Sequence, residues 1–196
     1  MSTGDPETRN RILAVTRHLM ETRQGQGVRL EDIAKAAGVS RQAVYMHFGS
    51  RPGLLIATAR YLDETLGLSE RVRPIFEAQT AVQALDALVV FWGNYIPDIY
   101  GLAKALLNAR AEDDAAAAAW DDRMEAVYDK CTRVIQQIDR EGKLAAEWSI
   151  ETGTDFCWSL LAISEWEHLT LECGWSNEQY IARIQTVLRK TLLIPD

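Results

Sequence analysis

Long apolar runs are missing from this chain of 196 residues. The longest, such as ALVVFWG, are far too short to span a bilayer, so we expect no membrane-spanning segment. The first ten residues, MSTGDPETRN, contain no apolar stretch of the kind that a secretory signal needs. Both absences favour a cytoplasmic protein without a membrane partner.

Cysteine is scarce, with three residues at Cys131, Cys157 and Cys173. Their odd number argues against a disulfide framework, and they lie too far apart for a metal-binding knuckle. We interpret them as reduced thiols whose main role is burial. The sequence therefore predicts neither a metal site nor a cofactor.

Enzyme signatures are absent as well. The chain has no phosphate-binding loop, no dinucleotide-type glycine pattern and no G-x-S-x-G nucleophile turn. Glu165, His168 and Glu172 could share one helix face and hold a metal ion or move protons. A polar stripe along a helix–helix contact is the favoured interpretation of the same spacing. We therefore expect no enzyme and name no catalytic residue.

Charge is distributed unevenly along the chain. Residues 1–60 hold nine Lys and Arg against five Asp and Glu, a difference of +4, whereas residues 61–196 hold twelve against twenty-three, a difference of −11. A basic N-terminal third would suit a domain that binds a polyanion, because attraction to phosphate acts at the docking face. Chance clustering of arginines on solvated helices explains the charge equally well, so charge alone leaves both alternatives open.

Helical periodicity runs through nearly the whole chain, and 47% apolar residues suffice for a core. Asp5 and Pro6 favour a first helix over residues 5–22. Further helices are expected over 29–38, 41–48, 49–66, 80–96 (ended by Pro97), 98–114, 115–142, 151–174 and 176–195. The sequence thus predicts an all-α protein of about nine helices.

The two short helices over 29–38 and 41–48 match the helix-turn-helix plan. Gly38 suits a left-handed helix end, and Ser40 is a natural N-cap for the second helix. Val44 and Phe48 stand four residues apart and can face inward. The other side of the second helix is then polar, as a helix needs to be if it lies in the major groove of DNA.

The stretch DIAKAAGVSRQAVYMHFGSRPGLL, residues 32–55, resembles the DNA-binding signature of the TetR family of transcriptional regulators. The resemblance runs from about Arg9 to about Leu62. It implies a three-helix DNA-binding head, here residues 1–54, and a linking helix that joins the head to a helical body, residues 55–196, which binds a ligand and dimerises. The chain departs from the family pattern at Arg29, where a capping Thr is common, and at Ala43, where a small polar residue that contacts bases is common.

Several side chains of the head are candidates for DNA contacts, although each could also be an ordinary solvated residue. Gln42 can pair with adenine, and Arg41 with guanine or a phosphate. Tyr45 can contact a phosphate or a thymine methyl group. The full predicted set is Arg29, Ser40, Arg41, Gln42, Tyr45, His47 and Arg51, with His47 and Arg51 placed for backbone phosphates.

Aromatic residues of the body are candidates for a ligand pocket, with burial in the core as the favoured alternative for any one of them. The predicted lining is Trp92, Tyr95, Trp120, Phe156, Trp158 and Trp166. Such a pocket would suit an apolar or aromatic inducer. Acidic neighbours such as Glu165 and Glu167 would also allow a cationic one.

The resemblance further implies a homodimer whose seam is formed by the last two long helices. The predicted seam residues are Leu160, Ile163, Trp166, Glu167, Thr170, Leu171, Ile181, Ile184, Val187, Leu188 and Leu192, which could instead pack against their own body. We expect a ligand-responsive transcriptional regulator, a repressor, that binds a palindromic DNA operator and is released by a small-molecule inducer. The alternative is a ligand-independent DNA-binding architectural or cell-cycle factor of the same fold.

Overall fold

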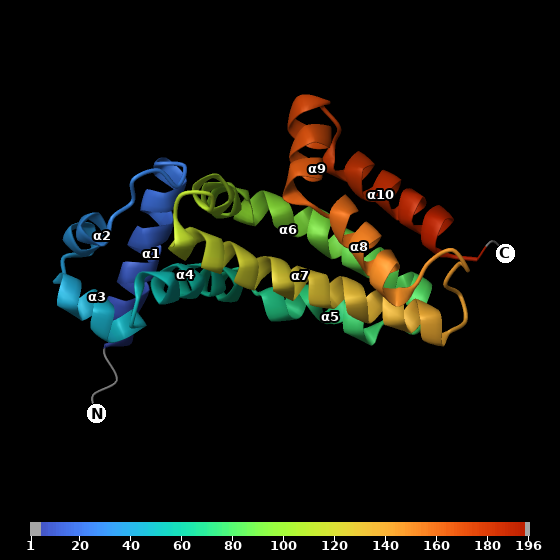
Figure 1. Cartoon of the computed structure of the whole chain (residues 1–196), viewed down its shortest axis with the longest axis horizontal. Helices are drawn as coiled ribbons and strands as arrows, with labels where there is room; N and C mark the ends of the chain where they lie inside the picture. Colours follow the sequence, from blue (N-terminus) through green and yellow to red (C-terminus); the bar gives the residue numbers. More distant parts are fainter. Residues whose placement is uncertain (1–4, 195–196) are drawn as a thin grey trace. The chain divides into compact units, whose positions relative to one another are not determined.

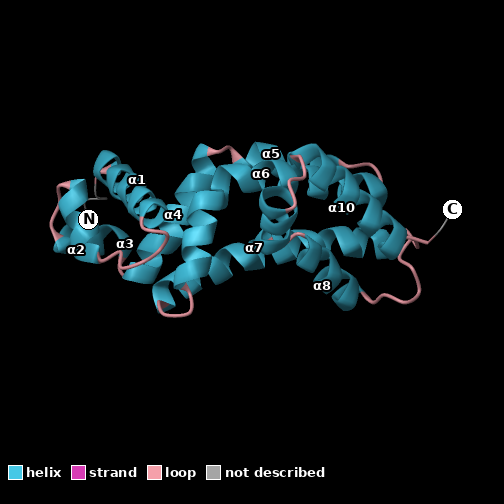
Figure 2. Cartoon of the chain, turned by 90° about the horizontal axis from the view of Figure 1, so that it is seen from above, coloured by secondary structure: helices cyan, strands magenta, loops and turns pink. Residues whose placement is uncertain are grey.

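The computed structural model describes residues 5–194 and is built of helices joined by short loops (Figure 1, Figure 2). Within those residues the β-type pairing is limited to an isolated antiparallel bridge between Leu144 and Leu193. The all-α fold expected from the sequence is confirmed. No helix of the described part is long and apolar enough to cross a membrane.

Contacts group the chain into two compact units, and the first holds residues 1–66 together with 99–124. Its N-terminal helices are α1 (Pro6–Thr22), α2 (Leu30–Ala37), α3 (Arg41–Phe48) and α4 (Arg51–Thr65). Helix α1 packs against α2 and α4, and α3 packs against the same two helices. Apolar side chains without solvent exposure form the core between them, among them Ile12, Leu13, Met20, Ile33 and Leu54.

The second unit holds residues 67–98 and 125–196. Its elements include α5 (Leu68–Glu77), α8 (Ile150–Leu160), α9 (Ile163–Glu167), the π-helical turn η1 (His168–Glu172) and α10 (Asn177–Leu192). Helix α10 contacts α8 and η1. Helices α6 (Ala81–Ala109) and α7 (Asp114–Arg140) each contribute residues to both units.

The functional boundary expected after residue 54 remains a proposal, because contacts divide the chain along other lines. They group all of α4 with the first three helices, together with residues 99–109 of α6 and 114–124 of α7. The head is therefore packed against the loop between α6 and α7 within one unit.

Gly25 fixes the close approach of the α1–α2 loop to α6. Its φ is +81°, and a Cβ atom there would lie 2.1 Å from the carbonyl oxygen of Ala105. Gly27 in the same loop also has a positive φ, +61°, but its Cβ would meet no atom within 4 Å. Only glycine fits at residue 25 for reasons of both conformation and space.

The helix end predicted at Pro97 is wrong, because α6 continues through this residue from Ala81 to Ala109. Proline removes one backbone hydrogen bond and its ring presses on the preceding turn, at a cost of about 3 kcal/mol. Buried side chains on both sides of it, such as Tyr95, Ile96 and Leu102, hold the helix together. Burial of this apolar stripe outweighs the local preference of one residue.

The single helix predicted over 151–174 is also wrong in detail. The chain forms α8, breaks at Leu161 and Ala162, and resumes as α9 and η1. Helix α5 was not predicted at all. The indole Nε1 of Trp92 donates a hydrogen bond to the carbonyl oxygen of Leu161 at the break. A tertiary partner thus takes up a carbonyl that a continuous helix would have used internally.

Candidate DNA interface

Helix α3 is held by a capped start and an apolar underside. The Ser40 hydroxyl accepts a hydrogen bond from the Ala43 backbone N–H at 3.1 Å, and Gly38 ends α2 in the left-handed conformation with φ at 66°. Val44 is buried, and Phe48 is half-buried with the Arg9 guanidinium 5.5 Å from its ring centroid. These contacts fix which side of α3 faces outward.

The outward side of α3 carries the side chains expected to meet DNA. Arg41 and Gln42 are exposed in the first turn, and 43% of the Tyr45 surface is open to solvent. Met46 is 81% exposed, an unusual state for a methionine of a folded domain. Arg41 is not free, because its Nη1 lies 2.7 Å from Oε1 of Glu31 in α2.

Three other predicted DNA contacts lie around this helix. Arg29 is exposed at the N-cap position of α2, where its backbone N–H points at the Asp32 carboxylate. Ser40 precedes α3, and His47 is half-buried beside the Phe48 ring. All three carry groups that can donate hydrogen bonds to phosphate oxygens.

Arg51, the last predicted DNA contact, is engaged inside the protein. Its guanidinium forms an ion pair with Asp113 and donates a hydrogen bond to the carbonyl oxygen of Val28 at 2.9 Å. The side chains of both Arg51 and Asp113 are 23% exposed. Arg51 therefore joins the start of α4 to the α1–α2 loop and to the residue before α7.

Asp113 has a second role as the cap of α7. Its Oδ1 accepts hydrogen bonds from the backbone N–H groups of Ala115 at 3.0 Å and Ala116 at 3.3 Å. Burial raises the pKa of this carboxyl, but the hydrogen bond and charge of Arg51 and the two backbone donors outweigh burial and lower it. Asp113 is thus ionised at neutral pH and binds both partners.

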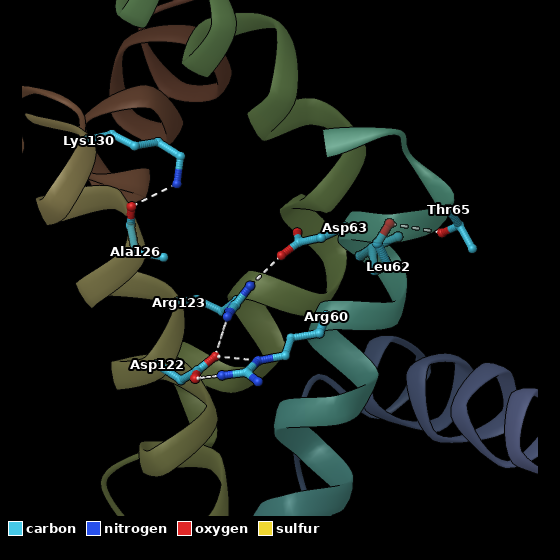
Figure 3. Close-up of polar contacts among 8 residues, drawn as sticks. All are labelled: Arg60, Leu62, Asp63, Thr65, Asp122, Arg123, Ala126 and Lys130. Carbon is cyan, nitrogen blue, oxygen red and sulfur yellow. Dashed lines mark hydrogen bonds and ion pairs between the residues drawn. The ribbon is translucent and has the colours of Figure 1, made fainter. Parts of the chain in front are cut away.

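A further ion-pair cluster joins α4 to α7 farther along both helices (Figure 3). Asp122 of α7 accepts hydrogen bonds from Arg60 of α4 and from its own neighbour Arg123, which also pairs with Asp63 of α4. Burial raises the pKa of Asp122, but the two arginines outweigh burial and lower it. With the Arg51–Asp113 pair, this cluster fastens α4 to α7 at two places about two and a half turns apart.

The predicted pocket aromatics do not form a single cluster. Trp92 and Tyr95 are buried on α6 and both contact Phe91. The remaining four have other neighbours. The Trp120 ring lies under the Arg110 guanidinium, and Phe156 contacts Trp148. Trp158 is 36% exposed and meets Tyr128 edge-on, whereas buried Trp166 donates a hydrogen bond to the side chain of Asn177.

The predicted seam residues divide by burial. Five of them are buried within their own protomer, as the alternative interpretation has it: Ile163, Trp166, Ile184, Leu188 and Leu192. Leu171 is 58% exposed and Val187 41% exposed. The half-buried remainder are Leu160, Glu167, Thr170 and Ile181.

Three residues that belong to the candidate interface or hold its arginines were missed from the sequence: Met46, Glu31 and Asp113. Met46 stands four residues after Gln42, so helical spacing could have placed it on the outward side. Glu31 and Asp113 could not be found in this way, because their arginine partners lie 10 and 62 residues away along the chain. Among the described residues, no group of three or more His, Cys, Asp or Glu is arranged to hold a metal ion.

Comparisons with known proteins identify the head. Residues 12–58 match the sequence model of the bacterial regulatory proteins of the tetR family. The HTH-type transcriptional regulator AlkX of Mycobacterium tuberculosis is 43% identical over 58 residues, and this match spans 30% of the chain and 28% of the length of AlkX.

Other relatives match most of the chain at lower identity. The HTH-type transcriptional repressor BepR of Brucella suis is 26% identical over 175 residues, which cover 83% of this chain and 81% of BepR. The nucleoid occlusion factor SlmA of a Marinomonas species is 24% identical over 147 residues, 74% of this chain and 72% of SlmA.

Solved structures share the fold. A transcriptional regulator from Saccharomonospora viridis, solved in complex with choline, superimposes with a TM-score of 0.74 at 18% identity and covers 97% of this chain and 100% of its own. At this identity the likeness extends to the fold alone. The matched head, together with the relatives that align with most of the chain, places the chain in the TetR family, whose members are DNA-binding transcriptional regulators and not enzymes.

Proposed function

We propose that the chain represses transcription by binding a palindromic operator as a homodimer, and that a small inducer releases it. The outward face of α3 is the observation that supports this function. Its first two turns present Arg41, Gln42, Tyr45 and Met46 to solvent, while Val44 anchors the helix from below. A reading helix needs this division between donors outside and apolar contacts inside.

Direct reading of bases is assigned to Gln42 and to its neighbours one turn on. The Gln42 amide can donate to N7 and accept from N6 of adenine, which distinguishes this base in the major groove. Tyr45 and Met46 offer apolar surface to the methyl group of thymine. Arg41 can reach guanine or a phosphate once DNA competes with Glu31 for its guanidinium.

Phosphate contacts are assigned to Arg29, Ser40 and His47, which are exposed or half-buried in the helix-turn-helix segment and carry hydrogen-bond donors. Arg51 is given a different role from the one that the sequence suggested. Because Asp113 and the Val28 carbonyl oxygen already occupy its guanidinium, Arg51 positions the head within its unit rather than clamping a phosphate.

A homodimer follows from the size of the reading face. One α3 covers only a few base pairs, and two copies about 34–36 Å apart reach successive turns of the major groove. The side chains best placed for the seam are the exposed Leu171 and Val187, and Trp158 of α8 is a further exposed apolar side chain of the same unit.

Sedimentation tests the seam with a matched pair of variants. Val187→Glu should shift the protein from dimer to monomer, because a carboxylate buried between protomers has no partner. Val90→Glu, at a valine of α6 with the same 41% exposure, should leave the dimer intact. A Val187→Glu protein that stays dimeric would place the seam elsewhere.

The inducer is proposed to be an apolar or aromatic small molecule, cationic where acidic side chains line its site. Support comes from the buried aromatic pair Trp92 and Tyr95, and from the fold relative that binds choline, a quaternary ammonium ion. Release is proposed to occur by population shift: the inducer binds best to a body conformation in which the two heads no longer match both half-sites. Helices α4 and α7 would move together, because two ion-pair clusters fasten them.

Selection of bound fragments from random DNA, followed by fluorescence anisotropy on the selected operator, tests the function. Gln42→Ala should weaken operator binding by about five- to a hundredfold, equivalent to about 1–3 kcal/mol, and leave scrambled DNA unaffected. Gln136→Ala, at an exposed glutamine of α7, is the matched control and should change neither. Equal losses on operator and scrambled DNA would contradict base reading by Gln42.

The same operator then screens for inducers. A compound that releases the protein should also change tryptophan fluorescence in a saturable manner, because Trp92 lies in the proposed lining. If no compound of an amphipathic and cationic library does either, the ligand-independent DNA-binding factor becomes the better assignment, and the likeness to SlmA favours it.

A further inference from the structure

Cys173, His168 and Glu172 form a linked row of side chains at the end of η1, in the second unit. His168 Nδ1 lies 2.9 Å from Oε2 of Glu172, and His168 Nε2 lies 3.8 Å from Sγ of Cys173. The side chains of His168 and Glu172 are 60% and 66% exposed, and Cys173 is exposed as well. A small molecule in solution can therefore reach all three.

The π-helical turn is what brings the thiol onto the imidazole. In an α-helix the residue five positions on points about 140° away around the axis, since each residue turns by about 100°. Here the backbone N–H of Cys173 bonds to the carbonyl oxygen of His168 at 2.9 Å, the i to i+5 pattern of a π-helix. The wider turn sets Glu172 and Cys173 on either side of His168.

The contacts also fix which ring nitrogen faces the thiol as a base. An ionised carboxylate only accepts hydrogen bonds, so the Nδ1 that meets Glu172 carries the proton of the neutral ring. Nε2 is then the acceptor, and it is the atom beside the sulfur of Cys173. A nucleophile, a base and a group that orients the base thus stand in the order that activated thiols require.

We propose that Cys173 is a reactive thiol that is modified by soft electrophiles of the α,β-unsaturated carbonyl class. His168 Nε2 takes the S–H proton as the sulfur lone pair forms a bond to the β-carbon. The C=C π pair moves to the α-carbon and carbonyl oxygen as an enolate, which then takes a proton from the imidazolium or from water. The sum is addition of S and H across the double bond, with no oxidant or reductant.

The other two thiols provide internal references. Cys131 and Cys157 are fully buried in the same unit, and the hydrogen bond with the Cys157 thiol together with burial raises the pKa of Cys131 well above its ordinary value. The thiolate is the nucleophilic form, so neither residue should compete with Cys173 in the folded protein. Modification should therefore be confined to one of the three cysteines.

The test is the rate of alkylation by N-ethylmaleimide, followed by intact mass and by peptide mapping. Cys173 of the folded protein should react at least about tenfold faster than the same residue in the denatured chain, which gives the intrinsic rate under the same conditions. His168→Gln should bring the folded rate down to that of the denatured chain. A His168→Gln protein that reacts as fast as the wild type would overturn the proposal, as would a Cys173 that the folded state protects.

Glu172 is a positioning residue, and its variant needs a readout of its own. Glu172→Gln should slow alkylation several-fold and should also move the tautomer of His168 away from Nδ1–H, as seen in the ¹⁵N shifts of the imidazole. Glu165→Gln, which removes an exposed carboxylate on the preceding turn, is the matched control and should change neither measurement. If the two variants had equal effects, Glu172 would act only through its negative charge, and the inference that it orients the His168 imidazole would be refuted.

Discussion

Asp113 is the residue at which the packing of the head can be tested most directly. Its carboxylate binds the Arg51 guanidinium and caps α7 through the N–H groups of Ala115 and Ala116. Asp113→Asn keeps an oxygen for the cap and removes the charge that holds Arg51. Asp113→Ala removes both, so the two variants separate the contributions.

The size of each effect follows from the contacts. Loss of an N-cap side chain costs about 1 kcal/mol. Breaking a partly buried ion pair leaves the Arg51 guanidinium with only the Val28 carbonyl oxygen as a strong partner, at a cost of about 1–3 kcal/mol. Asp113→Asn should therefore lower the free energy of unfolding by about 1–3 kcal/mol, and Asp113→Ala by about 2–4 kcal/mol.

Urea unfolding measures both values, and a double-mutant cycle assigns the ion-pair contribution. Arg51→Met combined with Asp113→Asn should cost less than the sum of the single variants by about 1 kcal/mol or more, because each single change leaves the other charge unpaired. Operator binding should weaken in step with the loss of the pair, since Arg51 ties the start of α4 to the α1–α2 loop. Additive energies, or unchanged binding by all three variants, would refute the role given to Arg51.

Three further outcomes are expected. Gly25→Ala should lower the free energy of unfolding by about 2 kcal/mol or more, because the new Cβ would collide with the Ala105 carbonyl oxygen. Gly27→Ala should lower it by only about 1 kcal/mol, the cost of its positive φ. Equal urea midpoints of the two variants would exclude the collision. Glu31→Gln should strengthen binding to any duplex and steepen the salt dependence by about one, as measured by anisotropy; an unchanged slope would mean that Arg41 does not reach the DNA. The pKa of Asp122 is lowered below its ordinary value of 3.8 in the folded protein. Its ion pairs therefore stabilise the fold fully above pH 3.8, and this contribution is lost as the pH falls through the lower folded pKa. In Asp122→Asn the free energy of unfolding should accordingly depend less steeply on pH in acid.

The head was predictable because its local signals agree with one another. Asp5 and Ser40 cap the helices that they were expected to cap, and Gly38 has the left-handed conformation that a helix end requires. Each of these signals depends on residues only a few positions apart, so it can be recognised in the sequence. Together with the inward-facing position expected for Val44, which is buried, these caps predict which face of α3 points outward.

Partners distant in sequence were not predictable, and Arg51 illustrates the reason. A basic residue at the start of a helix next to the reading helix predicts a phosphate contact, because an arginine seeks an anion. The sequence shows that this arginine needs an anionic partner, but it does not identify the partner. Asp113, which lies 62 residues away, is this partner inside the protein. The same limit applies to Arg60, whose acceptor Asp122 lies at the same separation along the chain.

A helical period identifies residues that share a face, but not the surface that covers the face. Along α10 the residues Tyr180, Ile184, Leu188 and Leu192 recur every fourth position, a stripe that fits a dimer seam and a protomer core equally well. The protein buries all four within one chain and leaves Val187 exposed on another side of the same helix. An apolar stripe that is fully covered in the protomer cannot also supply the seam. We therefore propose that the interface uses the apolar positions of the predicted seam that remain exposed, Leu171 and Val187.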